Sequence, residues 1–126
     1  MKEELKIKDV MIGDWVDVRN NAAPNTPHLE RITPSHFLRD EHWYGVELVP
    51  EILEKNGFVE INDDKKWYKM KLLEENDFVG LEKLEDNYWM FGAVVFPNLI
   101  NQLFFKYVHE LQHALKLCEI EKSIEL

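Results

Sequence analysis

Alternating apolar and polar residues mark several short segments in the first half of the chain. Trp15–Arg19 has the period of two that is typical of a half-buried strand, and the turn signal Gly13-Asp14 precedes it. Leu29–Ile32 and Trp43–Leu48 are further strand candidates. Residues 20–27, rich in Asn and Pro, are expected to form a loop.

The second half begins with a short predicted helix over Pro50–Gly57, with proline at its first position and glycine just past its end. A meander should follow, with turns at 62–65, 74–77 and 85–87 between strands at Phe58–Ile61, Lys66–Leu73, Phe78–Leu84 and Tyr88–Phe96. The last strand is apolar at nearly every position. We therefore expect it in the middle of a sheet with both faces covered, and we expect Pro97 to end it. Leu103–Tyr107 fits another strand or the approach to a helix.

Val108–Cys118 has the three-and-four spacing of an amphipathic helix. Its apolar stripe comprises Val108, Leu111, Ala114, Leu115 and Cys118. Because Cys118 falls on this stripe, we interpret it as a small core residue and not as a nucleophile.

These elements predict an α+β protein. The Gly-Asp turn that opens a Trp-Val strand resembles the start of an SH3-like small β-barrel, so residues 1–49 are expected to form an SH3-like lobe. Residues 50–126 would contain the short helix, the antiparallel meander and the C-terminal helix that packs on it. The two lobes could also share one compact domain, because 126 residues suffice for a single core.

Charge argues against a nucleic-acid partner. The chain has 15 basic and 24 acidic residues, a formal charge of −9, and its basic residues are spread along the sequence. The densest basic stretch, Lys65–Lys71, interleaves lysines with aromatic residues as single-strand binders do, but acidic residues flank it closely. Nucleic-acid binding through this stretch is kept as a third hypothesis.

The chain has no feature of an exported or membrane-spanning protein. Its charged beginning lacks the apolar region of a signal peptide, and the apolar run Trp89–Phe96 is too short to cross a bilayer. The lone cysteine provides no disulfide framework. We therefore expect a cytoplasmic protein.

One catalytic pattern occurs, His109-Glu110-x-x-His113. Two histidines four residues apart on a helix can both bind Zn²⁺, and the glutamate can act as general base toward a metal-bound water. The usual third ligand is missing, because only thirteen residues follow His113 and a lysine occupies the position of the expected glycine. The helical spacing also places both histidines opposite the apolar stripe, as on a polar surface.

Three aromatic pairs recur at Trp43-Tyr44, Trp67-Tyr68 and Tyr88-Trp89. Neighbouring residues of a strand point to opposite faces, so one ring of each pair can lie off the core. Cross-strand packing on a two-sided sheet is the favoured explanation of the pairs. If a protein partner binds, the expected contact residues are Trp43, Tyr44, Trp67 and Tyr88.

Three blocks of the chain together resemble a family of small uncharacterised proteins from Bacteroides-type gut bacteria and their phages. The blocks are Met11–Val16, Glu47–Phe58 and Tyr107–Leu115 continuing through Ile124-Glu125-Leu126. The family typically reads Thr at the position of Val49, and its ending also occurs as Val-His-Gln-Leu-Gln. The resemblance therefore implies that Glu110 and His113 are replaceable, and it implies a phage or mobile-element setting without a reaction or cofactor.

The sequence thus favours a non-enzymatic protein–protein interaction module without a cofactor. The alternatives are a small zinc-dependent hydrolase, with Glu110 catalytic and His109 and His113 as ligands, and a nucleic-acid-associated protein.

Overall fold

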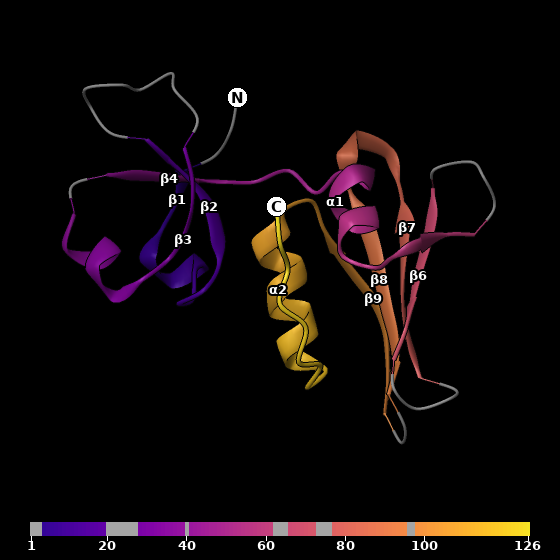
Figure 1. The fold of residues 1–126 in the computed structure, drawn as a ribbon. Helices are drawn as coiled ribbons and strands as arrows, with labels where there is room; N and C mark the ends of the chain where they lie inside the picture. The colour runs from indigo at the N-terminus through magenta and orange to yellow at the C-terminus, as the bar shows by residue number, and fades with distance from the viewer. Residues whose placement is uncertain (1–3, 20–27, 40, 62–65, 73–76, 96–97) are drawn as a thin grey trace. The chain divides into compact units, whose positions relative to one another are not determined.

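A computed structural model describes residues 4–19, 28–39, 41–61, 66–72, 77–95 and 98–126. The chain divides into two compact units, each built on one antiparallel sheet (Figure 1). The first unit contains the chain up to Glu47 together with Tyr107–His109, and the second contains Leu48–Lys106 and Glu110–Leu126. The predicted α+β class is confirmed. The loop expected at 20–27, parts of the turns at 62–65 and 74–77, and Pro97 lie outside the described residues.

The first unit has a sheet of four short strands in the order β1-β4-β2-β3. Two 3-10 helices, Ile7–Asp9 and Pro34–Leu38, accompany the strands β1 (Glu4–Leu5), β2 (Trp15–Arg19), β3 (Leu29–Arg31) and β4 (His42–Gly45). Within the described ranges no pairing joins β1 to β3, so the sheet is open there. The SH3-like barrel therefore stays a prediction.

The core of the first unit lies on one face of this sheet. It comprises Val10, Val16, Val18, Ile32 and Trp43, with Leu5 and Phe37 packed against it. The residue between the two core valines of β2, Asp17, is also buried. Arg19 pairs with its carboxylate at 3.0 Å, and the His28 N–H donates to it at 3.1 Å. A charged residue can be buried there because both contacts stabilise the ionised form.

Gly45 provides a close approach to the aromatic ring of Tyr107. A Cβ at residue 45 would lie 2.5 Å from that ring. The neighbouring backbone is tied as well, because Val108 N–H donates to the Val46 carbonyl at 2.8 Å. These contacts explain why Tyr107–His109 belong to the first unit although they lie far along the chain.

The second unit has a five-stranded sheet in the order β5-β6-β7-β8-β9. The elements are α1 (Pro50–Lys55), β5 (Val59–Glu60), β6 (Trp67–Lys71), β7 (Phe78–Lys83), a 3-10 turn (Glu85–Asn87), β8 (Trp89–Val95), β9 (Asn98–Phe105) and α2 (Val108–Leu117). The segment from Leu103, which fitted either a strand or the approach to a helix, contains the end of β9, and that strand begins earlier, at Asn98. Strand β8 lies between β7 and β9, as expected for an inner strand. Only one of its faces is fully covered, because Trp89, Phe91 and Ala93 are buried whereas Met90 on the other face is half-buried.

One face of the second sheet carries the core. Its buried residues include Tyr68, Val79, Leu81, Trp89, Phe91 and Phe105 from the strands, and Leu53 from α1. The predicted stripe of α2 is confirmed, since all five of its residues are buried. The chain after α2 is fixed to α1 by Asn56, whose amide donates to Glu125 O at 2.7 Å and accepts from Glu125 N–H at 2.7 Å.

Two glycine substitutions test this packing. We expect Gly45→Ala to lower the free energy of unfolding by about 1–3 kcal/mol, because the new methyl group would overlap the Tyr107 ring. Gly80→Ala is the matched control, since a Cβ there meets nothing closer than 4.0 Å and its stability should be unchanged or slightly higher. Urea denaturation of both variants measures the difference, and equal effects would contradict the close approach.

Candidate interaction face

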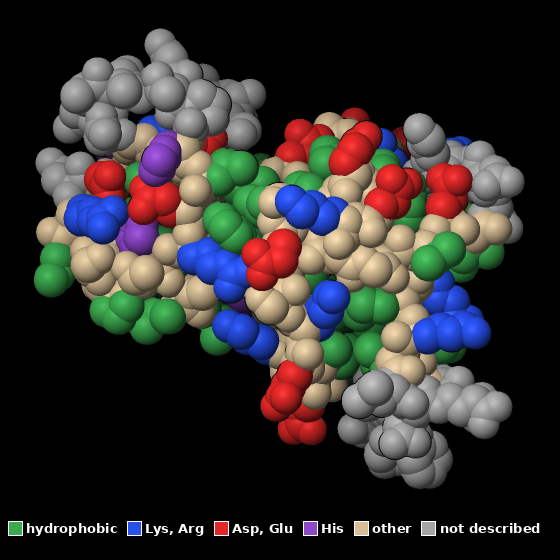
Figure 2. Space-filling model, in the orientation of Figure 1, with side chains coloured by type: hydrophobic (Ala, Val, Ile, Leu, Met, Phe, Trp, Pro, Cys, Tyr) green, Lys and Arg blue, Asp and Glu red, His purple; other side chains and the backbone are tan. Residues whose placement is uncertain are grey.

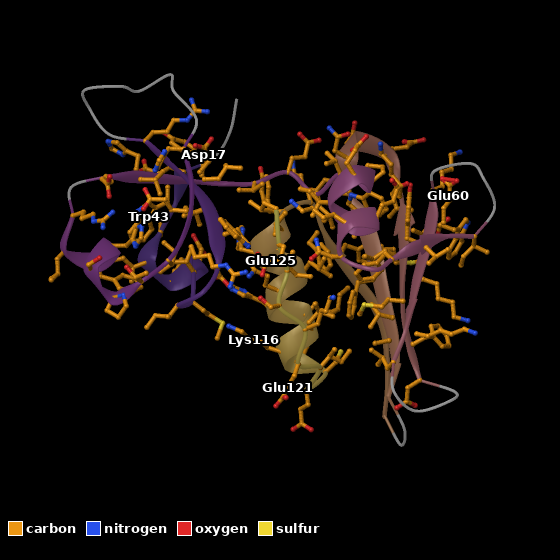
Figure 3. All side chains as sticks on the ribbon, viewed as in Figure 1. Asp17, Trp43, Glu60, Lys116, Glu121 and Glu125 are labelled. Carbon is orange, nitrogen blue, oxygen red and sulfur yellow. The ribbon has the colours of Figure 1, made fainter. Side chains whose placement is uncertain are left out.

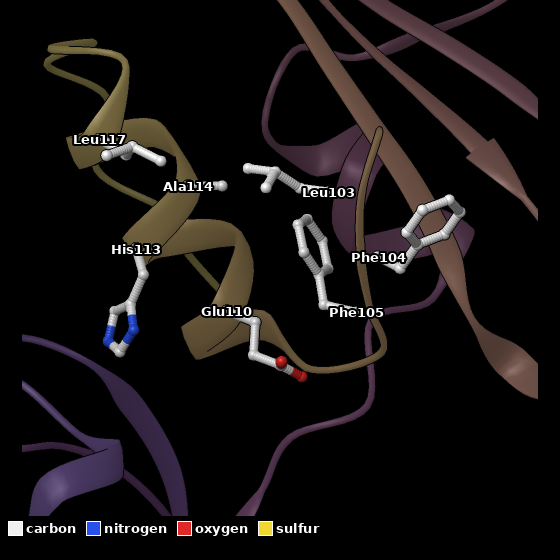
Figure 4. Close-up of a pocket in the computed structure, with 7 residues that line it drawn as sticks. All are labelled: Leu103, Phe104, Phe105, Glu110, His113, Ala114 and Leu117. Carbon is white, nitrogen blue, oxygen red and sulfur yellow. The ribbon is translucent and has the colours of Figure 1, made fainter. Parts of the chain in front are cut away.

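The side chains of the second sheet that point away from its core form a single surface, which we call the outer face. Strand alternation assigns its members, because Tyr68, Val79, Leu81, Trp89 and Phe91 all point inward. Figure 4 shows the same division on β9, where Leu103 and Phe105 point toward α2 and Phe104 points away. The outer face comprises Val59, Ile61, Trp67, Lys69, Lys71, Phe78, Gly80, Glu82, Leu84, Tyr88, Met90, Gly92, Phe104 and Lys106.

One row across the outer face, which we call the apolar row, consists of large apolar side chains with Glu82 among them. The strand register pairs Trp67 with Glu82, Glu82 with Met90, and Met90 with Phe104. Ile61 extends the row, because its N–H donates to the Trp67 carbonyl at 3.0 Å. The exposed fractions are 56% for Phe104, 52% for Ile61 and 37% for Trp67. Apolar groups exposed side by side on one surface are typical of binding sites.

Beside this row, two positions of the outer face have no side chain because they are glycines. Gly80 and Gly92 pair directly across β7 and β8. The fold does not require a glycine at residue 80, where a Cβ would have ordinary space. Packing therefore does not explain the absence of a side chain at residue 80.

The outer face is locally basic although the chain is acidic. It carries Lys69, Lys71 and Lys106 against Glu82 as its one acidic residue among the positions that the structure describes. The Lys69 ammonium lies 4.4 Å from the ring centroid of Phe78, within the range of a cation–π contact. Figure 2 shows lysine and hydrophobic side chains side by side over the region of β6.

The four aromatic residues predicted to bind a partner are divided between the units. Trp67 and Tyr88 lie on the outer face in adjacent rows, and both are exposed. In the first unit, Trp43 is only 5% exposed within the core (Figure 3), where its ring meets the edge of Phe37 at 5.7 Å. Tyr44 is half-buried, with the Arg19 guanidinium 5.6 Å from its ring centroid.

The sequence did not identify the aliphatic residues of the outer face or its members on the edge strands β5 and β9. Met90 follows from the alternation of the predicted Tyr88–Phe96 strand, once that strand is known to have one open face. Phe104 could not be assigned, because the segment around it fitted either a strand or a helix approach. Val59 and Ile61 required the pairing of β5 with β6.

Among the described residues, His109, Glu110 and His113 do not form a group of three ligands that could hold a metal ion. His109 is 4% exposed and stacks on the Tyr107 ring at 5.8 Å, so the expectation of a polar surface position is wrong for this residue. Glu110 and His113 belong to the second unit and line a hollow of about 380 Å³ between α2 and β9 (Figure 4). Glu110 also accepts the Lys106 backbone N–H at 3.3 Å. In the described part of the chain, no three His, Cys, Asp or Glu residues are grouped to hold a metal ion.

Two buried groups stay in their neutral forms. Burial raises the pKa of the Cys118 thiol, which lowers its thiolate fraction and agrees with a packing role. Burial, with the nearby Glu60 carboxylate, raises the pKa of Tyr68 to about 12. Neither group is prepared for nucleophilic chemistry at neutral pH.

No family model, curated protein or solved structure matches the chain. None of the described helices combines the length and apolar character needed to cross a membrane.

The zinc hypothesis has a direct test. We expect protein purified without a histidine tag to contain no stoichiometric zinc, because two histidines without a third grouped ligand bind the metal weakly. Added zinc should not shift the thermal midpoint of the unaltered chain, and it should not shift that of His113→Ala. Elemental analysis and thermal denaturation check both points, and one zinc per chain that is lost in His113→Ala would revive the hydrolase.

Proposed function

We propose that this chain is a non-enzymatic protein–protein interaction module that binds its partner through the outer face. The observation that supports this most is one row of the outer face, in which Ile61, Trp67 and Phe104 are exposed to solvent and Met90 is half-buried. Burying such surface against a partner gives about 25 cal/mol per Å² of apolar area, whereas leaving it exposed contributes nothing to folding.

The geometry around the titratable groups supports binding over catalysis. Glu110 and His113 lie beside a hollow lined mostly by apolar side chains, and His109 is occupied by its stacking contact with Tyr107. A hydrolase would need a nucleophile or metal-bound water beside a base. Within the described residues, the grouping of ligands for such a metal is absent.

We also propose an SH3-like fold for the first lobe and a phage or mobile-element setting for the protein. Residues 1–49 are proposed to be an SH3-like lobe, supported by the four antiparallel strands of the first unit and by the Gly13-Asp14 turn before β2. A phage or mobile-element setting is proposed from the resemblance of the three sequence blocks.

Site-specific photocrosslinking in the cell that makes the protein tests the proposed function. We expect p-benzoylphenylalanine at Trp67 or Phe104 to give one discrete protein adduct, because both positions lie in the exposed row. Leu38 in the first unit is the control; it is 90% exposed and does not belong to the outer face, so its crosslinker should not give that adduct.

A second variant links the adduct to binding. Trp67→Ala should remove the adduct formed from residue 104 while leaving the thermal midpoint nearly unchanged, because the Trp67 side chain lies outside the core. The absence of adducts from both outer-face positions, or equal adducts from residue 38, would contradict the proposal.

A further inference from the structure

We infer that the partner of the outer face is an acidic protein segment whose apolar side chains cover the row from Ile61 to Phe104 and whose carboxylates meet the outer-face lysines. The inference rests on the proposed function and adds the chemistry of the partner.

The charge of the outer face is opposite to that of the chain. Three lysines against one glutamate give the described outer face a local charge of +2, whereas the whole chain carries −9. Complementary charge selects partners and orients them, whereas like charges placed together are costly. A basic segment would place its charges against Lys69, Lys71 and Lys106, so the local charge favours carboxylates.

The lysines lie on both sides of the apolar row. Lys69 and Lys71 follow Trp67 along β6 at two-residue intervals, on one side of the row. Lys106 lies on the other side, beyond Phe104, with its ammonium 4.8 Å from the ring centroid of Tyr88. A segment with apolar residues in its centre and carboxylates toward its margins satisfies both features. This arrangement matches the usual interface, with an apolar core and a polar rim.

The same surface fits a single-stranded nucleic acid less well. Base stacking needs free aromatic ring faces and a positively charged groove. Lys69 covers a face of Phe78, and Lys106 covers a face of Tyr88. Val59, Ile61 and Met90 add aliphatic surface, which does not stack with bases. Glu82 lies within the apolar row, where it would repel phosphates.

A charge reversal tests the chemistry of the partner. Lys69→Glu with Lys71→Glu lowers the net charge by four, and so does the matched control Lys116→Glu with Lys122→Glu at two exposed positions outside the outer face. With p-benzoylphenylalanine at residue 104, we expect the outer-face variant to lose about tenfold of the adduct and the control to change less than about twofold. If the thermal midpoint shows that the outer-face variant does not fold, Lys69→Gln with Lys71→Gln makes the same comparison.

The outcomes separate the inference from the proposed function. An adduct that persists equally in both charge variants would overturn the inference and leave the interaction module standing, whereas no adduct in the unaltered chain would overturn the proposed function itself. A nuclease-sensitive adduct, or one of twice the mass of this chain, would identify a nucleic acid or a second copy and would also overturn the inference. A protease-sensitive adduct with another protein, lost only in the outer-face variant, supports it.

Discussion

The buried indole of Trp89 fixes which face of the second sheet points inward. Its side chain is fully buried, its Nε1–H donates to the Leu48 carbonyl at 2.9 Å, and its ring meets Tyr68 edge-on at 5.8 Å. Truncating a buried tryptophan typically costs about 3–5 kcal/mol, so a register that exposed it would be strongly disfavoured. Because strand residues alternate, burying Trp89 also sends Tyr88 and Met90 to the outer face.

The position of the outer face therefore follows from the burial of the core. The folded second unit does not bury the exposed side chains of this face. Trp67, Ile61 and Phe104 are exposed and do not belong to the buried core, and the glycine at residue 80 is not required by packing. Apolar residues in such positions lower solubility without improving stability. The proposed partner accounts for their presence on one side of one sheet, beside lysines in an acidic chain.

Local patterns predicted much of the fold, and long-range pairing decided most of the candidate site. The period of two identified β2, and three-and-four spacing identified α2 with its buried stripe, because each signal lies within one element. The alternation did not show which ring of each aromatic pair faces outward, since Trp43 is buried and Trp67 is exposed at similar positions in their pairs. That outcome depends on which side of each sheet is covered.

Two further features depended on contacts between distant parts of the chain. His109 is buried because Tyr107, which packs on Gly45, lies against its ring. Lys71 and Lys106 belong to one basic surface because β6 and β9 join the same sheet, although 35 residues separate them in the sequence. The basic residues are spread evenly along the sequence. The fold nevertheless brings several lysines together on one surface.

Fluorine NMR of protein labelled with 5-fluorotryptophan tests most directly which indole lies on the open side of the second sheet. The four resonances, assigned with single Trp→Phe variants, are compared in H₂O and D₂O. We expect a clear solvent isotope shift for Trp67 and none for Trp89. A protected Trp67 together with a solvent-responsive Trp89 would contradict it, because the face described as open would then be the covered one.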